Sequence, residues 1–451
     1  MEPMERRSAA QIKQWAQEND GRPLLIRGAR RVGKTTLVQI VAAECFAHVV
    51  KLDFQTDLQM LERVFDVPTD DLDRIVRNIA EYKGVRISPK ETVLFFDEVQ
   101  LCEKALNSLR FFSGSQWRVI ATGSLFGVTV RQRKLPFPSG VKQIRLHPMD
   151  FEEFLWAMNE RPLADSIREH CISGEPLLLH DRALDLYHRY LVVGGMPRVV
   201  QQYRTTWLMD DVEEQQREID ETYVADMTDP ENGISGASAK RIWESIPRQL
   251  LRSSTKKFKY NEVVRGGRRA SLLEPLEWLQ AAGIVLQNDM THDSCAPLAP
   301  YEEEEGSFFK IYLADTGLMF HKFGLDAGVF LDPSTRALLS SDFRGALAEN
   351  ATMQALAACE LKTYYWTPKG NVRGELDFVT QTRRGLVVPI EVKSGRNVSA
   401  KTLKKFVLEG KSPIAVRLSE LNFGSSEIEG TGSELRGIPL YAAFAISDLF
   451  E

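Results

Sequence analysis

The segment from residue 23 to residue 45 constrains the fold more than any other part of the sequence. Residues 23–27 are mostly apolar and predict a short strand, residues 28–36 read GARRVGKTT, and residues 34–45 have helical spacing. The middle part matches the pattern G-x-x-x-x-G-K-[ST], which functions between a strand and a helix. This strand-loop-helix order therefore predicts an α/β domain with a phosphate-binding loop.

The residue types of this loop suit a nucleoside triphosphate. Glycines let backbone N–H groups curl around phosphates, and the N-terminus of the following helix adds partial positive charge. Lys34 would reach the β- and γ-phosphates, and Thr35 would offer its hydroxyl to Mg²⁺. We therefore expect ATP and Mg²⁺ as ligands. The predicted nucleotide-binding residues are Gly28, Ala29, Arg30, Arg31, Val32, Gly33, Lys34, Thr35 and Thr36.

A second motif ends an apolar stretch at residues 93–98, VLFFDE. Asp97 would hold the Mg²⁺ shell, and Glu98 would polarise the attacking water as general base. The alternative is a pair of exposed acids at a strand end. Another predicted strand ends at Thr122, so Ser124, with Thr122 close behind it, is the candidate for sensing the γ-phosphate, against the alternative of a plain turn.

Further predicted strands at residues 48–53, 92–97, 118–122 and 143–146 are separated by stretches long enough for helices, which indicates a parallel sheet. Arg131 and Arg133 follow the fourth strand of this domain. They are candidate arginine fingers toward a neighbouring subunit, although surface basic residues are the commoner reading. The candidate catalytic residues are Lys34, Glu98, Ser124, Arg131 and Arg133.

Six stretches of the sequence resemble the AAA+-related bacterial and archaeal ATPases that pair an AAA_14-type domain with a C-terminal DUF4143 region. They lie at residues 28–36, 96–100 (FDEVQ), 122–125 (TGSL), 148–154 (PMDFEEF), 190–197 and 390–395. The resemblance implies ATP hydrolysis and an oligomer-prone ATPase core, with a hexamer as one form. It marks Gln100 as typical of the family, without an assigned role.

At 451 residues the chain exceeds the size of a single hydrophobic core. We predict an AAA+-like P-loop ATPase domain at residues 1–158, a helical lid at 159–236, a winged-helix-like domain at 237–335 and a PD-(D/E)xK nuclease-like αβ domain at 336–451. Glycines 194 and 195 precede Met196 and Pro197 and are expected to shape a helix junction.

The third predicted domain contains a strongly basic stretch. Between residues 248 and 269 the chain carries eight basic residues and one acid, Glu262. Helices at 242–251 and 272–281 and strands at 284–286 and 308–313 suit a winged helix, with residues 271–282 as recognition helix and 302–305 as a solvated loop tip. Such modules bind either DNA or protein. The candidate DNA-binding residues are Arg252, Lys256, Lys257, Lys259, Arg265, Arg268 and Arg269.

The last domain carries acids in a pattern that resembles the PD-(D/E)xK nuclease core. Asp377 and Glu391 lie on adjacent predicted strands, Glu349 lies on the preceding helix, and Lys393 shares a strand face with Glu391. Glu349, Asp377 and Glu391 would hold Mg²⁺, and Lys393 would approach the attacking water. The alternatives are acids retained for DNA binding or for a structural salt bridge.

Composition excludes several classes of protein. The five cysteines form no C-x-x-C pair, which argues against zinc ribbons and disulfide frameworks, and no apolar run is long enough to cross a membrane. We expect a cytoplasmic location. Three hypotheses remain: an ATPase that engages DNA, including branched or Holliday-junction DNA; a nucleotide-switched regulator of a protein partner; and a Mg²⁺-dependent structure-specific nuclease.

Overall fold

Strand β1 (Leu24–Gly28) belongs to a five-stranded sheet in which every neighbouring pair is parallel. The computed structural model describes the chain except residues 1–3, 19–20, 125–128, 131–132, 135–137, 253–255, 304–305, 371–373, 396–400 and 451. The strand order is β2-β3-β4-β1-β7. The other strands are β2 (His48–Asp53), β3 (Thr92–Asp97), β4 (Arg118–Gly123) and β7 (Lys142–Leu146). The predicted P-loop sheet is thus confirmed.

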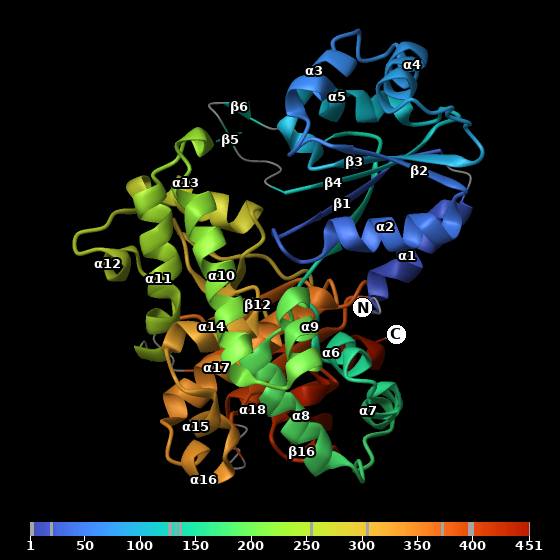
Figure 1. Cartoon of the computed structure of the whole chain (residues 1–451). Coiled ribbons are helices and arrows are strands. Elements are labelled where there is room, and N and C mark those ends of the chain that lie inside the picture. The colour runs from blue at the N-terminus through green and yellow to red at the C-terminus, as the bar shows by residue number, and fades with distance from the viewer. Residues whose placement is uncertain are drawn as a thin grey trace. The chain divides into compact units, whose positions relative to one another are not determined.

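Helices cover both faces of this sheet (Figure 1). Helices α1 (Arg7–Gln17) and α2 (Lys34–Cys45) lie on one face. The other face carries α3 (Leu58–Val64), α4 (Leu72–Lys83) and α5 (Glu103–Phe112), with the short η1 (Val99–Leu101) before α5. Strand β3 is buried at all its positions because both of its faces are covered, which explains its continuous apolar run.

The chain divides into two compact units. The first comprises residues 1–147, 225–236 and 274–283, and the second comprises 148–224, 237–273 and 284–451. Two later segments thus join the first unit, which contains the phosphate-binding loop. The first segment runs from the end of α10 (Met209–Thr228) through η2 (Pro230–Asn232). The second contains most of α13 (Arg269–Ala281). The predicted boundary after residue 236 coincides with one point of this division, whereas those at 158 and 335 lie within the second unit.

The second unit contains an eight-stranded mixed sheet in the order β11-β8-β12-β13-β14-β15-β17-β16. The expected wing strands, β8 (Val285–Thr291) and β11 (Phe309–Leu313), pair antiparallel, and β8 also pairs parallel with β12 (Thr363–Trp366). The predicted boundary at residue 335 therefore divides one sheet, because β12 satisfies the open edge of β8. The remaining strands are β13 (Leu376–Gln381), β14 (Val387–Val392), β15 (Ile414–Ser419), β16 (Gly424–Ile428) and β17 (Ser433–Pro439).

Helices surround this sheet, and those predicted around residues 150, 185, 245 and 350 are present. No described helix is long and apolar enough to span a membrane. Two short hairpins, β5 (Thr129–Val130) with β6 (Arg133–Lys134) and β9 (Glu302–Glu303) with β10 (Gly306–Ser307), complete the described strands. The helices are α6 (Phe151–Ala157), α7 (Arg161–Ser173), α8 (His180–Val193), α9 (Pro197–Thr206), α11 (Gly236–Arg252), α12 (Tyr260–Val263), α14 (Thr316–Phe323), α15 (Ala327–Leu331), α16 (Pro333–Arg336), α17 (Ser341–Ala358), α18 (Lys401–Gly410) and η3 (Leu440–Leu449).

The two glycines between α8 and α9 shape a tight helix junction, as the sequence predicted. Gly194 has a φ of 76°, which favours glycine. The backbone N–H of Gly195 donates to Asp315 Oδ2 at 2.6 Å, and its carbonyl accepts from the Met149 N–H at 2.7 Å. A Cβ on Gly195 would lie 1.9 Å from the Met149 carbonyl oxygen. The junction therefore depends on the absence of a side chain.

We expect Gly195→Ala to lower the free energy of unfolding of the second unit by about 3 kcal/mol, because the backbone must move to admit the methyl group. Denaturant unfolding measures the effect. Gly424→Ala is the control, since a Cβ there meets nothing within 4 Å. Equal stability of the two variants would contradict the prediction.

Candidate functional site

The phosphate-binding loop is built around two glycines. A Cβ on Gly28 would lie 2.2 Å from the Leu146 carbonyl oxygen, so only glycine allows β1 this approach to β7. Gly33 has a φ of 91° and stands directly before α2. Lys34, which is 5% exposed, donates from Nζ to the carbonyl oxygens of Gly28 and Ala29 at 3.1 Å each. The loop thus holds its lysine across the place where phosphates would bind.

Asp97 lies at the carboxyl end of β3 and is 3% exposed. Its Oδ1 accepts hydrogen bonds from Thr35 Oγ1 at 2.9 Å and from Thr122 Oγ1 at 2.5 Å. Hydroxyl and carboxylate oxygens are the ligands that Mg²⁺ prefers. Thr35 and Asp97 therefore fit a Mg²⁺ ion, which would neutralise charge on the phosphates.

Lys51 on β2 completes the surroundings of Asp97 and was missed from the sequence. Its Nζ lies 2.8 Å from Asp97 Oδ2 and 2.9 Å from Asp53 Oδ2. The pKa of Lys51 is raised, since its hydrogen bonds to the two carboxylates outweigh the lowering effect of burial. In the sequence, the only indication of this contact is that residues 51 and 53 lie on the same face of a strand. It can be recognised only once β2 is known to lie beside β3, with Asp53 opposite Asp97.

The conformation of Glu98 is fixed by three neighbours. Its φ of 56° is in the left-handed region, and its N–H donates to Thr122 Oγ1 at 3.2 Å. Gln100 Nε2 donates to Glu98 Oε2 at 2.6 Å, and Lys34 Nζ lies 3.7 Å from Oε1. Burial lowers the pKa of Lys34 against the opposing effect of Glu98. Gln100 thus gains a role as the residue that positions Glu98.

The remaining predicted residues of this site have different outcomes. Thr122, rather than Ser124, forms the hydrogen bonds with Asp97 and Glu98. Arg131 lies outside the described residues, and the side chain of Arg133 is likewise not described. Neither arginine-finger prediction is therefore tested, and both stay predictions.

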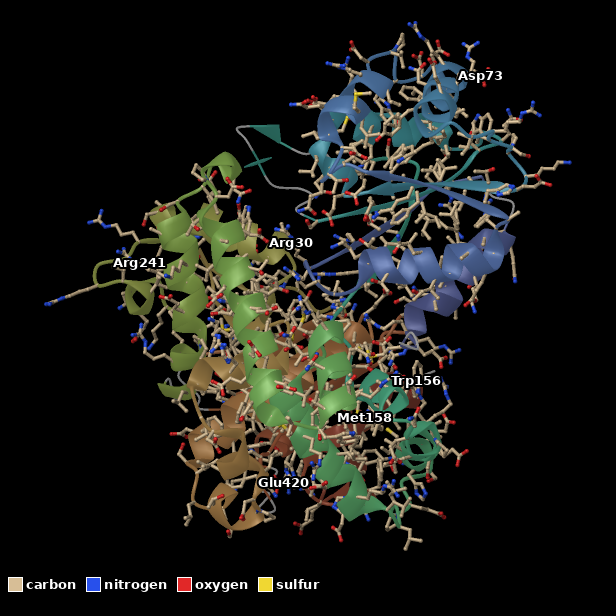
Figure 2. The ribbon with its side chains drawn as sticks, in the orientation of Figure 1. Arg30, Asp73, Trp156, Met158, Arg241 and Glu420 are labelled. Atoms are coloured by element: carbon tan, nitrogen blue, oxygen red, sulfur yellow. The ribbon has the colours of Figure 1, made fainter. Side chains whose placement is uncertain are left out.

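A segment distant in the sequence reaches the phosphate loop within the same unit. The Arg30 guanidinium (labelled in Figure 2) forms an ion pair with Asp226, which lies near the C-terminal end of α10. Burial raises the pKa of Asp226, and Arg30 opposes that effect. A Cβ on Gly283 would lie 3.2 Å from the backbone nitrogen of Ala29. Both later segments of the ATPase unit thus contact the loop.

In the second unit, the acids predicted near the C-terminus form an acid–lysine centre. We use this name for Lys256, Lys310, Tyr312, Glu349, Glu375, Asp377, Glu391 and Lys393. Lys310 Nζ lies 3.0 Å from Glu349 Oε1 and 2.8 Å from Glu375 Oε1. Tyr312 donates to Glu349 Oε1 at 2.6 Å, and Lys256 pairs with Glu349 Oε2. Burial favours a raised pKa for Glu349, but the two lysines hold it at about 2.

The strand acids of the centre are held separately. Lys393 Nζ lies 2.9 Å from Glu391 Oε1, and Asp377 Oδ2 accepts from the Val392 N–H at 2.8 Å. Among the described residues no group of three or more His, Cys, Asp or Glu side chains is placed to hold a metal ion. Glu349, Asp377 and Glu391 as metal ligands therefore stay a prediction, and the contacts of this centre agree with the alternative of structural salt bridges.

The residues of the basic stretch fall into two groups: those whose side chains contact other side chains, and those that are exposed. Lys256 is committed to Glu349, and Lys257 lies 5.3 Å and 5.8 Å from the ring centroids of Phe308 and Tyr365. The side chain of Arg252 is not described. Four predicted DNA contacts are exposed: Lys259, Arg265, Arg268 and Arg269. They lie between Lys259, which precedes α12, and Arg269, the first residue of α13, and together form the exposed basic segment.

The predicted recognition helix α13 differs from expectation beyond its first turn. Leu276, Trp278 and Leu279 are buried, and the exposed face carries Glu274 and Glu277. Two carboxylates on the exposed face would repel phosphates, so the helix face does not suit a groove of DNA. Its basic N-terminal end remains the part that suits an anionic partner.

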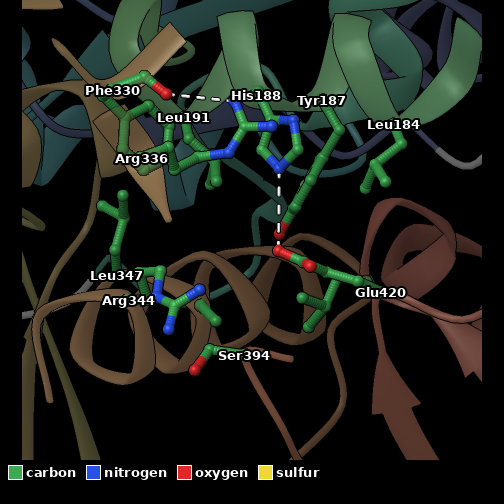
Figure 3. Close-up of a pocket in the computed structure, with 12 residues that line it drawn as sticks. Leu184, Tyr187, His188, Leu191, Phe330, Arg336, Arg344, Leu347, Ser394 and Glu420 are labelled. Carbon is green, nitrogen blue, oxygen red and sulfur yellow. Dashed lines mark hydrogen bonds and ion pairs between the residues drawn. The ribbon is translucent and has the colours of Figure 1, made fainter. Parts of the chain in front are cut away.

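A recess in the second unit brings together charged residues from separate segments (Figure 3). His188 Nε2 lies 3.7 Å from Glu420 Oε1, and Arg336 Nη1 donates to the Phe330 carbonyl at 3.0 Å. Arg344 lines the same recess, and its buried Nε has no hydrogen-bond partner. No sequence pattern marked these residues, because they lie far apart along the chain.

Family models match three parts of the chain. A model described as AAA domain (AAA_14) matches residues 20–155. The chain carries an AAA-type ATPase domain. Two models of domains of unknown function follow, DUF8612 at residues 184–328 and DUF4143 at residues 344–427. The predicted pairing of AAA_14 with DUF4143 is therefore confirmed, and the middle match covers parts of both the predicted lid and the predicted winged helix.

Solved structures give weaker likenesses, and no curated protein matches the chain. The Walker-type ATPase PABY2304 of Pyrococcus abyssi is 15% identical with a TM-score of 0.41, covering 71% of this chain and 96% of that one. The Drosophila ORC bound to DNA is 12% identical with a TM-score of 0.26, covering 70% and 85%. With TM-scores below 0.5, neither supports a statement about function.

For the AAA-type domain, we expect Lys34→Ala to reduce ATP turnover about 100-fold, because the buried ammonium no longer meets the phosphates. Steady-state phosphate release measures the effect. Lys13→Ala serves as control, since Lys13 pairs with Glu44 on the surface. Turnover equal to that of the wild type would contradict the assignment.

We also expect Gln100→Ala to lower kcat about 10-fold while ATP affinity is unchanged, because Glu98 loses the donor that orients it. Phosphate release and nucleotide titration separate the two quantities. Gln100→Met keeps the side-chain length without the amide. Wild-type kcat in Gln100→Met would show that packing, not the hydrogen bond, is what Gln100 contributes.

Proposed function

We propose that this protein is an ATP-hydrolysing AAA-type ATPase that engages DNA through its exposed basic segment. The observation that carries the proposal concerns α13. Its first residue is the exposed Arg269, and the chain beyond its end reaches Gly283, which contacts the phosphate loop at Ala29. The chain of α13 thus leads from the basic segment toward the nucleotide site, and coupling between DNA and nucleotide would pass along it.

The charge of the basic segment favours a polyanion as partner. Lys259, Arg265, Arg268 and Arg269 are exposed, whereas the whole chain has a net charge of −5. Neutralising several phosphates at once requires such a local density of cations, and the affinity then falls steeply with salt. Contacts to phosphates carry no sequence information, which suits recognition of DNA shape, including branched DNA.

ATP and Mg²⁺ complete the proposal at the nucleotide site. Thr35 and Asp97 would hold the ion, Lys34 would hold the phosphates, and Glu98, oriented by Gln100, would accept a proton from the attacking water. Triphosphate binding places negative charge near Arg30, which now pairs with Asp226. If the phosphates compete with Asp226 for Arg30, the end of α10 loses its ion pair. This would be a second route from the nucleotide to the rest of the chain.

We expect Arg268→Glu with Arg269→Glu to weaken binding to duplex, forked and four-way DNA at least about 10-fold and to reduce its salt dependence. Fluorescence anisotropy in the presence of ATP measures both. Arg74→Glu with Arg77→Glu on α4 is the matched control, because it reverses the same number of exposed charges in the ATPase unit. If neither pair of substitutions changes the affinity for DNA, the proposal is contradicted.

A nucleotide-switched regulator that binds a protein is the second candidate. The exposed pair Trp207 and Leu208, 57% and 58% exposed between α9 and α10, favours it because aromatic and aliphatic side chains are typical anchors of interfaces. A stoichiometric protein partner that Trp207→Ala releases, together with no DNA binding, would favour this candidate over the first.

The assembly and location of the protein remain part of the proposal. A homo-oligomer, including a hexamer, would let Arg131 or Arg133 act on a neighbouring nucleotide, as in other ATPases with arginine fingers. The five described cysteines are free thiols, which suits the cytoplasm. The nuclease alternative receives no support from the contacts of the acid–lysine centre.

A further inference from the structure

The acid–lysine centre holds a cation that belongs to the chain itself. We infer that Lys310 is the resident counter-ion of this centre, so that the C-terminal sheet takes no divalent cation and engages its partners without metal-dependent cleavage. This inference is independent of the proposed ATPase and DNA-binding function, because it concerns different residues.

The position of Lys310 is the first observation. Its side chain is 0% exposed, and its ammonium lies between Glu349 and Glu375 at 3.0 Å and 2.8 Å. An ammonium has three donors. Two of them meet these carboxylates, and the ring of Tyr365 lies 5.1 Å from the same nitrogen. Two carboxylates and an aromatic ring thus favour a positive charge on this ammonium.

The balance of charge is the second observation. The centre contains four carboxylates, from Glu349, Glu375, Asp377 and Glu391, and three ammonium groups, from Lys256, Lys310 and Lys393. Buried carboxylates are costly unless they are paired, and here the lysines supply most of that pairing. A divalent ion bound by Glu349 would have to displace Lys310, whose side chain is fully buried.

The oxygens available to a metal are the third observation. Both oxygens of Glu349 and one oxygen each of Glu375, Asp377 and Glu391 already accept hydrogen bonds or ion pairs. The second oxygens of Glu375, Asp377 and Glu391 accept no further hydrogen bond from the described residues, and that of Glu391 is buried. A metal ion there would lack Glu349, because lysines and Tyr312 engage both of its oxygens.

The experiment measures Mn²⁺ binding to the full chain by the loss of the free-ion electron paramagnetic resonance signal. Thr35→Ala with Asp97→Asn first removes the nucleotide-site ligands. In this background we expect no stoichiometric Mn²⁺ site. One bound Mn²⁺ per chain that disappears on Asp377→Asn would overturn the inference.

A second variant tests Lys310 directly. Adding Lys310→Met to the same background keeps the side-chain length and removes the charge, so the acids are left uncompensated. We expect a gain of about one Mn²⁺ site and a rise in Tm with Mn²⁺ that Asp377→Asn abolishes. A folded Lys310→Met protein that binds no Mn²⁺ would also overturn the inference. If this variant does not fold, the measurement on the background alone still decides.

Discussion

The hydrogen bonds that converge on Asp97 are the interaction on which the rest of the ATPase unit depends. Thr35 from the phosphate loop and Thr122 from β4 share one oxygen of this carboxylate, and Lys51 from β2 holds the other. Three strands and the loop are thereby tied together at the carboxyl edge of the sheet. The burial of Asp97 makes these partners obligatory, because an unpaired carboxylate at that depth would be costly.

Each unit contains buried carboxylates whose negative charge must be compensated, and the two units compensate it differently. In the ATPase unit, the buried Asp97 has two hydroxyls and one ammonium as partners, in positions where a Mg²⁺ ion could replace or join them. In the acid–lysine centre, Lys310 sits between two carboxylates that would otherwise attract a metal. The difference lies in exposure, since Lys51 is 28% exposed and can move toward solvent, whereas Lys310 is 0% exposed and cannot.

Helix α13 has two ends with different surroundings. Its N-terminal end carries exposed arginines, whereas Leu276, Trp278 and Leu279 further along are buried. Pro275 lies inside the helix, between the basic end and these buried side chains. The charge of the first turn is therefore available to an anionic partner, while the rest of the helix is held by packing.

The sequence by itself determined the local chemistry: the loop ending in Lys34 and Thr35, the acid at the end of β3, and the order of strands and helices, because these depend on spacing along the chain. The tertiary structure decided which groups meet. It gave Thr122 the contacts with Asp97 and Glu98, added Lys51 and Asp226, gave Gln100 a partner, and placed Lys310 among acids predicted to hold a metal. Some of these contacts join residues that are far apart in the sequence and follow no sequence motif. Others depend on strand register, which sets the direction of each side chain. Tertiary packing fixes both the long-range contacts and the register, so neither could be predicted from the sequence.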